Sequence, residues 1–344
     1  MRLGYHTGYW SAGPPPGAAE AVLAADRLGL ESVWTAEAYG SDAFTPLAWW
    51  GARTSRVRLG TAVAQVAART PTATAMAALT LDHLSGGRFT LGLGVSGPQV
   101  VEGWYGQPYP RPLARTREFV AIVRDVLRRE GPVRAGGPFY RLPLPADEGS
   151  GLGKALRSTV HPLRADLPIH LAAEGPKNIA LAAEIADGWL PLFYAPRLDD
   201  EFRGLLAEGF DRRLAGTRPV EDFEVTATVP VVLGADVESA ADAVRPFVAL
   251  YAGGMGAKGA NFHANALARL GYAEACAEIQ AHYLAGDRAR AAAAVPTELV
   301  RDVALVGTPD DVREQAAAWR GTAVTTLLVQ AAPDQLEQIA GLLG

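Results

Sequence analysis

The stretch that decides the fold is LGTAVAQVAARTPTATAMAALTLDHLSGGRFTLGLGVSG, which runs from Leu59 to Gly97. It contains a strand-like run, a segment with the apolar spacing of an amphipathic helix, and a second strand-like run that ends in a glycine-rich turn. Such compact alternation is typical of a repeating β/α unit with parallel strands. The turn follows the carboxyl end of a strand, which is where β/α barrels carry their active sites.

The same alternation extends over most of the chain. Amphipathic helical segments separate eight strand-like runs, which are Arg2–Tyr5, Ser32–Thr35, Arg58–Ala64, Arg88–Leu93, Leu167–Leu171, Gly188–Pro191, Phe223–Leu233 and Thr325–Gln330. A doubly wound open sheet would show a similar alternation, but eight units favour a (β/α)8 TIM barrel of the α/β class. We therefore predict a single β/α barrel domain over residues 1–344.

Two regions interrupt the alternation. Residues 131–154 are rich in glycine and proline and contain the β-like piece PFYRLPLP, which predicts an inserted hairpin and loop. Residues 253–309 carry helical segments and predict a helical insertion, either a lid or an interface. The helix expected just before it has one apolar face, which indicates packing against a core, and that face consists of Ala240, Val244, Phe247, Val248 and Tyr251.

Composition limits the function classes. Of the 344 residues, 49% are hydrophobic and 20% charged, and the net charge is −5. A large core is therefore possible, and nothing favours nucleic acid or an anionic membrane as a partner. The single cysteine, Cys276, cannot form an intrachain disulfide. The N-terminus lacks signal-peptide architecture, and no apolar run approaches the roughly 20 residues that span a bilayer. We expect a cytoplasmic protein.

Three glycines, Gly92, Gly94 and Gly97, match the G-x-G-x-x-G spacing of dinucleotide-binding loops. That interpretation needs a helix to begin at the third glycine, within an N-terminal βαβ unit. Pro98 follows Gly97 instead, the next helix is expected near Arg115, and three strands precede the motif. We therefore expect a strand end whose glycines let a flat ligand approach the backbone.

Other catalytic motifs are incomplete. GVSGP, ending at Pro98, approaches the nucleophile elbow of hydrolases but lacks its final glycine and its expected helix. Ser96 is therefore expected to be a loop hydroxyl that can hydrogen-bond a ligand. The six histidines show no metal-ligand spacing and one cysteine cannot build a zinc site, so we expect no protein-bound metal. GGMGAKG at 253–259 lacks the ending of a phosphate-binding P-loop.

AAEGPK, from Ala172 to Lys177, is a more complete candidate. It follows the apolar strand LPIHL and begins a helix with Pro176 suited to its first turn. Free backbone N–H groups and the helix dipole at such a junction can bind an anion, although a purely structural β/α turn would look the same. In a barrel this junction lies on the active face, so a phosphate bound here would serve the active site.

Polar residues also follow the first two strands. Glu37 comes just after SVWT, and His6 and Tyr9 come just after the first strand, so all three are expected on the active face. A histidine there can bind substrate or relay a proton near neutral pH. A solvated carboxylate and a packed imidazole are the structural alternatives. Three aromatic residues near this rim are candidates for stacking on a flat ring or for local packing: Trp10, Trp104 and Tyr105.

Several long phrases carry a resemblance to a known family. They are AADRLGLESVWTAEAYGSDAFTPLAW, TSRVRLGTAVAQVAARTPTATAMAALTLDHLSGGRFTLGLGVSGPQVVEGWYG, PLARTREFV and AAEGPKNIALAAEIADGWLP, with TTLLV matching the last strand. The chain resembles the bacterial luciferase-like superfamily, in particular its branch that uses the deazaflavin coenzyme F-420. That branch includes methylene-tetrahydromethanopterin reductase and deazaflavin-dependent glucose-6-phosphate dehydrogenases.

The resemblance implies where a cofactor would lie. The third strand of the family often contains a cis peptide that supports the middle of the tricyclic ring, which maps to Ala62 and Val63. The loop of Val95, Ser96 and Gly97 would lie along the ring and linker. The phosphate loop of the family maps to Ala172, Ala173, Glu174, Gly175 and Pro176.

One position departs from the family pattern. Several relatives carry Asp-His after the second strand, with the histidine acting in catalysis, whereas this chain has Glu37 and Ala38. Glu37 can still bind the cofactor or move a proton, but Ala38 cannot do acid–base chemistry. We therefore expect His6 or Glu37 to supply any proton.

The resemblance implies an oxidoreductase that transfers a hydride between coenzyme F-420 and a small organic substrate. One alternative is a two-component monooxygenase of the same superfamily that uses flavin mononucleotide (FMN). A second is a non-catalytic cofactor-binding barrel, supported only by the absence of a histidine at Ala38. Relatives are commonly dimers, so a homodimer is expected.

Overall fold

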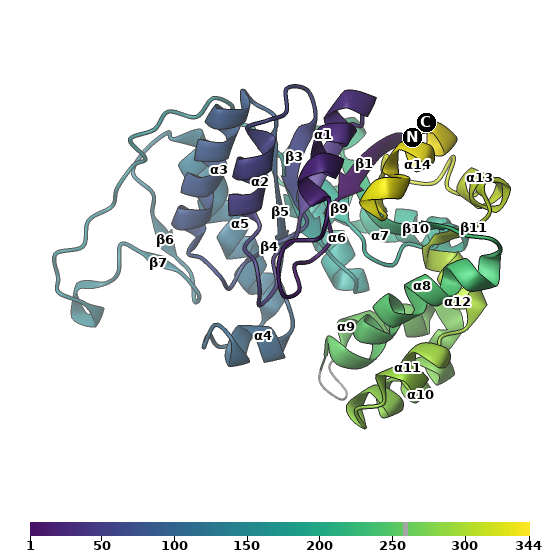
Figure 1. The fold of residues 1–344 in the computed structure, drawn as a ribbon. Helices are drawn as coiled ribbons and strands as arrows, with labels where there is room; N and C mark the ends of the chain where they lie inside the picture. Colours follow the sequence, from purple (N-terminus) through teal and green to yellow (C-terminus); the bar gives the residue numbers. More distant parts are fainter. Residues whose placement is uncertain (257–260) are drawn as a thin grey trace.

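The computed structural model describes residues 1–256 and 261–344, and eight parallel strands within it close into a barrel surrounded by helices (Figure 1). In order round the barrel these strands are β1 (Arg2–His6), β2 (Ser32–Thr35), β3 (Arg58–Thr61), β5 (Phe89–Gly94), β8 (Ile169–Ala172), β9 (Gly188–Leu190), β10 (Glu224–Leu233) and β12 (Thr326–Gln330). Pairing of β9 with β10 and of β12 with β1 closes the ring. The predicted (β/α)8 TIM barrel is confirmed.

Helices cover the outside of the barrel. They are α1 (Ala18–Leu28), α2 (Phe44–Gly51), α3 (Pro71–Ser85), α5 (Pro112–Arg128), α6 (Pro176–Ile185), α7 (Asp199–Phe210), α13 (Pro309–Ala317) and α14 (Leu336–Leu343). Their ends follow local chemistry, as α3 illustrates. Thr70 caps its first turn by accepting a hydrogen bond from the backbone N–H of Ala73, and Pro71 occupies the first turn. Gly86, with φ of 65°, ends the helix in the left-handed conformation.

The predicted third strand is divided. β3 ends at Thr61, and a two-residue strand, β4 (Ala64–Gln65), resumes the pairing with β5. The residues between them form a bulge in which the peptide bond from Ala62 to Val63 is cis. A further parallel strand, β11 (Leu305–Gly307), pairs with the end of β10, inside the segment predicted to be a helical insertion.

Both interruptions of the alternation are present. The antiparallel hairpin of β6 (Ala135–Gly136) and β7 (Arg141–Leu142) projects from the barrel (Figure 1). It is followed by η1 (Ala146–Glu148) and by irregular chain as far as β8. The helical insertion lies beside the barrel and begins earlier than the predicted residue 253, because the helix expected before it packs with it. It consists of α8 (Val237–Ala249), η4 (Leu250–Gly254), α9 (Phe262–Leu267), η5 (Ala268–Tyr272), α10 (Ala273–Leu284), α11 (Arg288–Ala293) and α12 (Thr297–Val303). Residues 257–260 of the predicted insertion lie outside the described residues.

The core has three parts. The largest packs the strands against the surrounding helices, and a second, separate cluster holds the helical insertion together around residues such as Val244, Val248 and Ile279. The third is a small cluster of Trp34, Leu190 and Leu328, on which the bulge residues pack. The bulge therefore rests on the side chains of these three residues, which form an apolar plug that fills the barrel interior.

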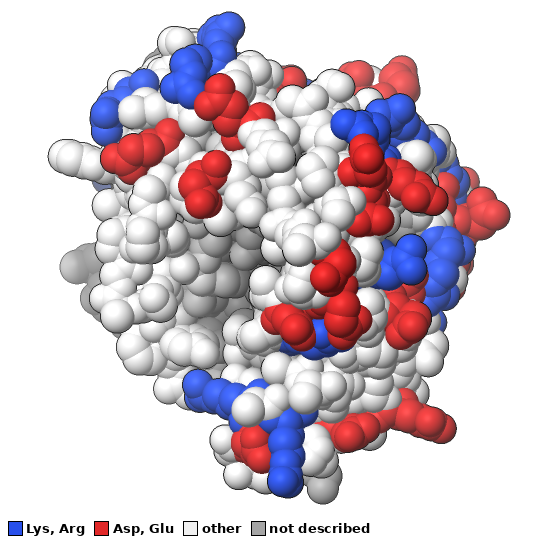
Figure 2. Space-filling view, turned by 45° about the vertical axis from the view of Figure 1, so that its right-hand side comes forward, with Lys and Arg blue, Asp and Glu red and all other residues white. Residues whose placement is uncertain are grey.

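The surface agrees with the composition. On the face that Figure 2 presents, Lys and Arg side chains are interspersed with Asp and Glu side chains. None of the helices in the described part of the chain combines the length and apolar character needed to cross a membrane.

The packing around Gly92 leaves no room for a side chain. A Cβ atom at Gly92 would lie 1.8 Å from the carbonyl oxygen of Thr61 and 2.8 Å from Leu190 Cδ1. Gly92→Ala should therefore lower the free energy of unfolding by about 1–3 kcal/mol or more, measured by urea denaturation. Gly204→Ala is the control, because a Cβ there meets nothing within 4 Å and α7 should gain up to about 1 kcal/mol. Equal stability of the two variants would contradict this account.

Candidate functional site

A cavity of about 1230 Å³ opens where the carboxyl ends of several strands meet. The residues that sequence reasoning proposed for catalysis or cofactor binding all line this cavity, namely His6, Glu37, Ala62, Val63, Val95, Ser96, Gly97, Ala172, Ala173, Glu174, Gly175 and Pro176. These residues come from loops that are far apart along the chain. The barrel brings them together because parallel strands present their carboxyl ends at one rim.

The bulge after β3 forms one wall of the cavity. Because the bulge interrupts the strand ladder, its backbone groups find other partners. The N–H of Ala62 donates to the carbonyl of Thr35 at 2.7 Å, and the N–H of Glu37 donates to the carbonyl of Val63 at 3.2 Å. On the other side, the Thr61 hydroxyl donates to the Gly92 carbonyl at 2.7 Å and accepts from the Gly92 N–H at 2.9 Å. The wall is thereby fixed on both sides.

His6 is buried and supports this bulge. Its Nδ1 accepts a hydrogen bond from the N–H of Gly8 at 3.0 Å, so the ring proton is on Nε2, which donates to the carbonyl of Ala62 at 3.3 Å. Burial lowers the pKa of His6 to about 4, and the hydrogen bond to Ala62 opposes this only partly. The imidazole is therefore neutral at physiological pH.

Glu37 is also buried and bound to the bulge. Its carboxylate accepts hydrogen bonds from the backbone N–H of Gln65 at 2.8 Å and from Nη1 of Arg69 at 2.9 Å. The Gln65 side chain donates to the Glu37 carbonyl at 3.0 Å. The carboxylate is thus an ion-paired brace between the loops after β2 and β4, and it faces the cavity from that position.

The glycine-rich loop after β5 differs from the prediction in one respect. A short helix, α4 (Pro98–Gly103), begins directly after Gly97, whereas we expected no helix before Arg115. Pro98 starts this helix because its φ is already helical and the first helical position needs no N–H. Ser96 has a φ of 58°, and its carbonyl accepts a hydrogen bond from the Tyr109 hydroxyl at 3.0 Å.

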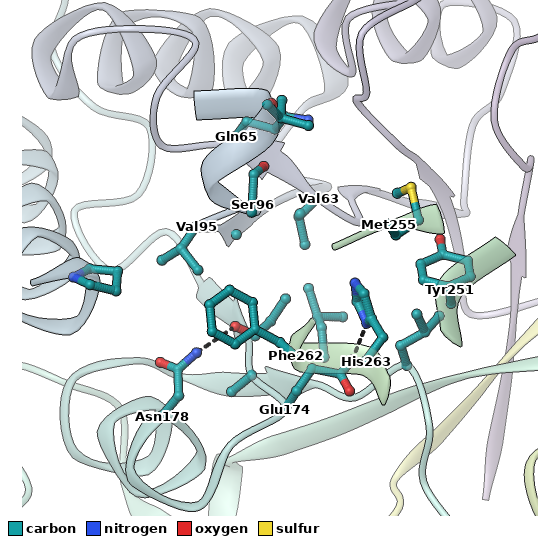
Figure 3. A pocket seen from close by; sticks show the side chains of 18 of the residues that line it. Val63, Gln65, Val95, Ser96, Glu174, Asn178, Tyr251, Met255, Phe262 and His263 are labelled. Atoms are coloured by element: carbon teal, nitrogen blue, oxygen red, sulfur yellow. Dashed lines mark hydrogen bonds and ion pairs between the residues drawn. The ribbon is translucent and has the colours of Figure 1, made fainter. Parts of the chain in front are cut away.

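The loop from Ala172 to Pro176 leads into α6, whose N-terminal cap is Gly175. The Glu174 carboxylate in this loop lies 3.4 Å from Nδ1 of His263 (Figure 3). The backbone carbonyl of Glu174 accepts a hydrogen bond from the guanidinium of Arg269. The contact with His263 is an ion-pair distance without hydrogen-bond geometry, and Nδ1 of His263 has no hydrogen-bond partner among the described residues. The helical insertion therefore binds this loop at two points.

Sequence reasoning missed the wall that the helical insertion supplies. Tyr251 in η4, Met255 directly after it, and Phe262 and His263 in α9 line the cavity, and Figure 3 labels all four. The hydroxyl groups of Tyr251 and Tyr9 are 3.2 Å apart. Apolar spacing had assigned Tyr251 to a core face, and no local motif marked the other three residues.

The rim aromatics have different roles. Trp104 and Tyr9 line the cavity. Trp10 packs on Trp50 instead, with ring centroids 6.3 Å apart, and Tyr105 is not among the lining residues. Within the described residues, no three His, Cys, Asp or Glu side chains come together in a way that could hold a metal ion.

Comparison with known proteins gives the following relatives. The family model for luciferase-like monooxygenase matches residues 3–326. A Mycobacterium tuberculosis protein, provisionally described as a coenzyme F-420-dependent oxidoreductase, is 56% identical over 344 residues, which are 100% of this chain and 99% of that protein. The 5,10-methylenetetrahydromethanopterin reductase of Archaeoglobus fulgidus is 27% identical over 327 residues, 92% of this chain and 91% of that protein.

Solved structures share the fold. The F-420-dependent tetrahydromethanopterin reductase of Methanopyrus kandleri superposes with a TM-score of 0.79 at 23% identity, over 100% of this chain and 97% of that one. An F-420-dependent secondary alcohol dehydrogenase, solved with an adduct of F-420 and acetone, gives a TM-score of 0.77 at 16% identity, over 100% and 99%.

Two buried histidines predict a pH-dependent stability. Burial lowers the pKa of both His6 and His170 from 6.5 to about 4. Between these values the unfolded chain binds protons that the folded chain does not, so stability should fall as the pH decreases through this window. The expected slope is about 1.4 kcal/mol per pH unit for each histidine, measured by urea denaturation from pH 7 to pH 4.5. His6→Asn should reduce the slope by the contribution of one histidine. An unchanged slope would contradict the lowered pKa of His6.

Proposed function

Because this chain belongs to the family of luciferase-like monooxygenases, we propose that it is an oxidoreductase that transfers a hydride between coenzyme F-420 and a small organic substrate. The observation that carries the proposal is the 56% identity to the F-420-dependent relative over the length of both chains. The cavity at the barrel mouth, with all of the expected site residues in its wall, supports it.

The residues present fit a large, flat, phosphorylated cofactor. The volume of about 1230 Å³ exceeds the range of about 300–1,000 Å³ that is usual for a single drug-sized ligand, so it accommodates a cofactor and a substrate together. Ala62 and Val63 offer an uncharged wall, held from behind by the apolar plug, against which one ring face would lie. Val95, Ser96 and Gly97 would follow the edge of the ring and its linker.

The loop of Ala172, Ala173, Glu174, Gly175 and Pro176 would hold the phosphate. It precedes the N-terminus of the ten-residue helix α6, where backbone N–H groups and the helix dipole favour an anion. Lys177, in the first turn, adds a positive charge to the same wall of the cavity. The carboxylate of Glu174 points to His263 (Figure 3), 3.4 Å from its Nδ1.

When bound, the deazaflavin would supply hydride chemistry, and the protein would orient its partners. His6 and Glu37 are the proposed groups for proton transfer near the ring, and their contacts define how each would act. His6 could donate a proton only from its neutral Nε2–H. That group is already hydrogen-bonded to the carbonyl of Ala62. Glu37 could accept a proton only by loosening its pair with Arg69. Both residues therefore also position the wall that supports the ring.

We also propose that the protein is a cytoplasmic homodimer. Trp49 on α2 and Met76 and Leu84 on α3 are 74%, 62% and 75% exposed. These helices are neighbours on the outside of the barrel (Figure 1). Exposed apolar side chains on adjacent helices support an interface between two copies.

Titration with coenzyme F-420 and, separately, with FMN tests the cofactor assignment. Quenching of the fluorescence of the seven tryptophans reports binding. We expect tight binding of the deazaflavin. Preference for FMN would instead favour a two-component monooxygenase, and binding of neither would contradict both functions.

Gly175→Asp should weaken binding of coenzyme F-420 by about tenfold or more, because it places a carboxylate beside the phosphate. A side chain fits here, since a Cβ at Gly175 meets nothing within 4 Å. Gly175→Asn has nearly the same shape without the charge and should bind almost normally. Equal affinity of the two variants would remove the phosphate assignment.

Trp49→Lys should convert the dimer to a monomer, measured by light scattering after size-exclusion chromatography. Leu284→Lys is the control, because Leu284 is 56% exposed but lies at the end of α10 in the helical insertion. A dimer that survives Trp49→Lys would exclude this interface.

A further inference from the structure

We propose that the substrate is a neutral carbonyl compound, or the corresponding secondary alcohol, whose oxygen is bound by the hydroxyl groups of Tyr9 and Tyr251. The inference rests on the proposed function for the hydride. It names the substrate class and assigns the proton taken by the substrate oxygen to Tyr9 in place of His6 or Glu37, whose side chains are engaged with Ala62, Gln65 and Arg69.

The two tyrosines reach the cavity from different parts of the fold. Tyr9 follows β1, and Tyr251 lies in η4 of the helical insertion. Their hydroxyl oxygens are 3.2 Å apart, with Tyr251 as donor, and both residues line the cavity. Tyr9 also contacts the ring of His6, which holds the bulge, with centroids 6.4 Å apart. The pair therefore lies close to the wall proposed for the cofactor ring.

The hydrogen bond between Tyr251 and Tyr9 uses the hydroxyl proton of Tyr251 and leaves that of Tyr9 available. A phenol has a single proton to donate, and Tyr251 gives its proton to the Tyr9 oxygen. Among the described residues, the Tyr9 hydroxyl has no acceptor for its own proton. Burial raises the pKa of both tyrosines, and Tyr39 raises them further, so both remain neutral donors at physiological pH. The free proton of Tyr9 is available to an oxygen in the cavity.

The surroundings favour a neutral substrate with apolar groups. Phe193 and Phe247 pack against the Tyr251 ring from inside the core, with centroids 5.7 and 4.8 Å away. The cavity lining also includes the apolar side chains of Leu192, Met255 and Phe262. The charged residue that acts on Tyr251 is Glu174, whose carboxylate raises the pKa of the phenol. A negatively charged substrate group would be repelled here, whereas a carbonyl or hydroxyl oxygen can accept the Tyr9 proton.

The reaction balances with this arrangement. Bound reduced deazaflavin would supply a hydride to the carbonyl carbon, which would form a C–H bond there and move the C=O π electrons onto oxygen. That oxygen takes the Tyr9 proton, Tyr9 takes the Tyr251 proton, and Tyr251 regains a proton from water at the cavity mouth. Oxidation of the alcohol follows the same path in reverse. Neutral donors aimed at the developing negative charge stabilise the transition state.

Binding of an isosteric pair of probes tests the oxygen site without turnover. The ketone is 4-phenylbutan-2-one, and its isostere is 2-methyl-4-phenylbut-1-ene, in which a methylene group replaces the oxygen. Affinities are measured by tryptophan fluorescence, both with oxidised coenzyme F-420 bound and without it. The ketone preference is the Kd of the alkene divided by the Kd of the ketone. We expect Tyr9→Phe to lower this ratio by about 3- to 10-fold, because one hydrogen bond to the ketone oxygen is lost.

Tyr283→Phe is the matched control. It removes a hydroxyl from the same insertion but lies outside the cavity lining, so the ketone preference should not change. With reduced coenzyme F-420 and the ketone, Tyr9→Phe should lower kcat by about 100-fold with a smaller change in KM. Tyr251→Phe, which keeps the Tyr9 donor but breaks the relay, should lower kcat less.

The outcomes separate this inference from the proposed function. An unchanged ketone preference in both Tyr9→Phe and Tyr251→Phe would overturn the tyrosine site. A loss of cofactor affinity in Tyr9→Phe, without a loss of ketone preference, would assign the hydroxyls to the cofactor and also overturn it. If the protein binds no coenzyme F-420, the proposed function fails, while the probe preference measured without cofactor still decides the tyrosine site.

Discussion

The constraint on which the site depends is the interruption of the third barrel strand between Thr61 and Ala64. A buried backbone segment that leaves the strand ladder must find other hydrogen-bond partners, because unpaired peptide groups in a core are costly. Here the carbonyl of Ala62 is bound by the His6 side chain and that of Val63 by the N–H of Glu37. On either side of the bulge, the Thr61 hydroxyl binds the backbone of Gly92 and the Glu37 carboxylate binds the N–H of Gln65. The residues most suggestive of chemistry are therefore also the residues that hold the backbone wall in place.

The cavity is built from two structural sources. The barrel contributes the bulge and the loops after β5 and β8, which are the parts proposed to bind the cofactor. The helical insertion contributes Tyr251 and His263 and contacts the loop after β8 through Glu174. The proposed hydride transfer would need two ligands held in contact, and a cavity with walls from two separately packed parts suits that need.

Much of this could be predicted from sequence, for identifiable reasons. The strands follow from short apolar runs, and residues after strand ends could be placed in one site because barrel geometry brings those ends together. α4 was missed because it has only six residues and begins with Gly-Pro, which usually marks a turn. β11 has three residues and no periodicity. Tyr251 was assigned to a core face because apolar spacing indicates burial without telling whether the covering element is protein or a cavity. Such long-range placement depends on tertiary packing that local patterns do not encode.

The helical insertion has an apolar core of its own, distinct from the core of the barrel. Substitutions inside it therefore act mainly on packing within the insertion, and they reach the barrel only through residues such as Phe193 and Val306 that belong to the same cluster. The side of the cavity that carries Tyr251 and Phe262 can change shape in this way while the bulge on the barrel side stays in place. A fold divided like this separates the element that varies from the element that supports it.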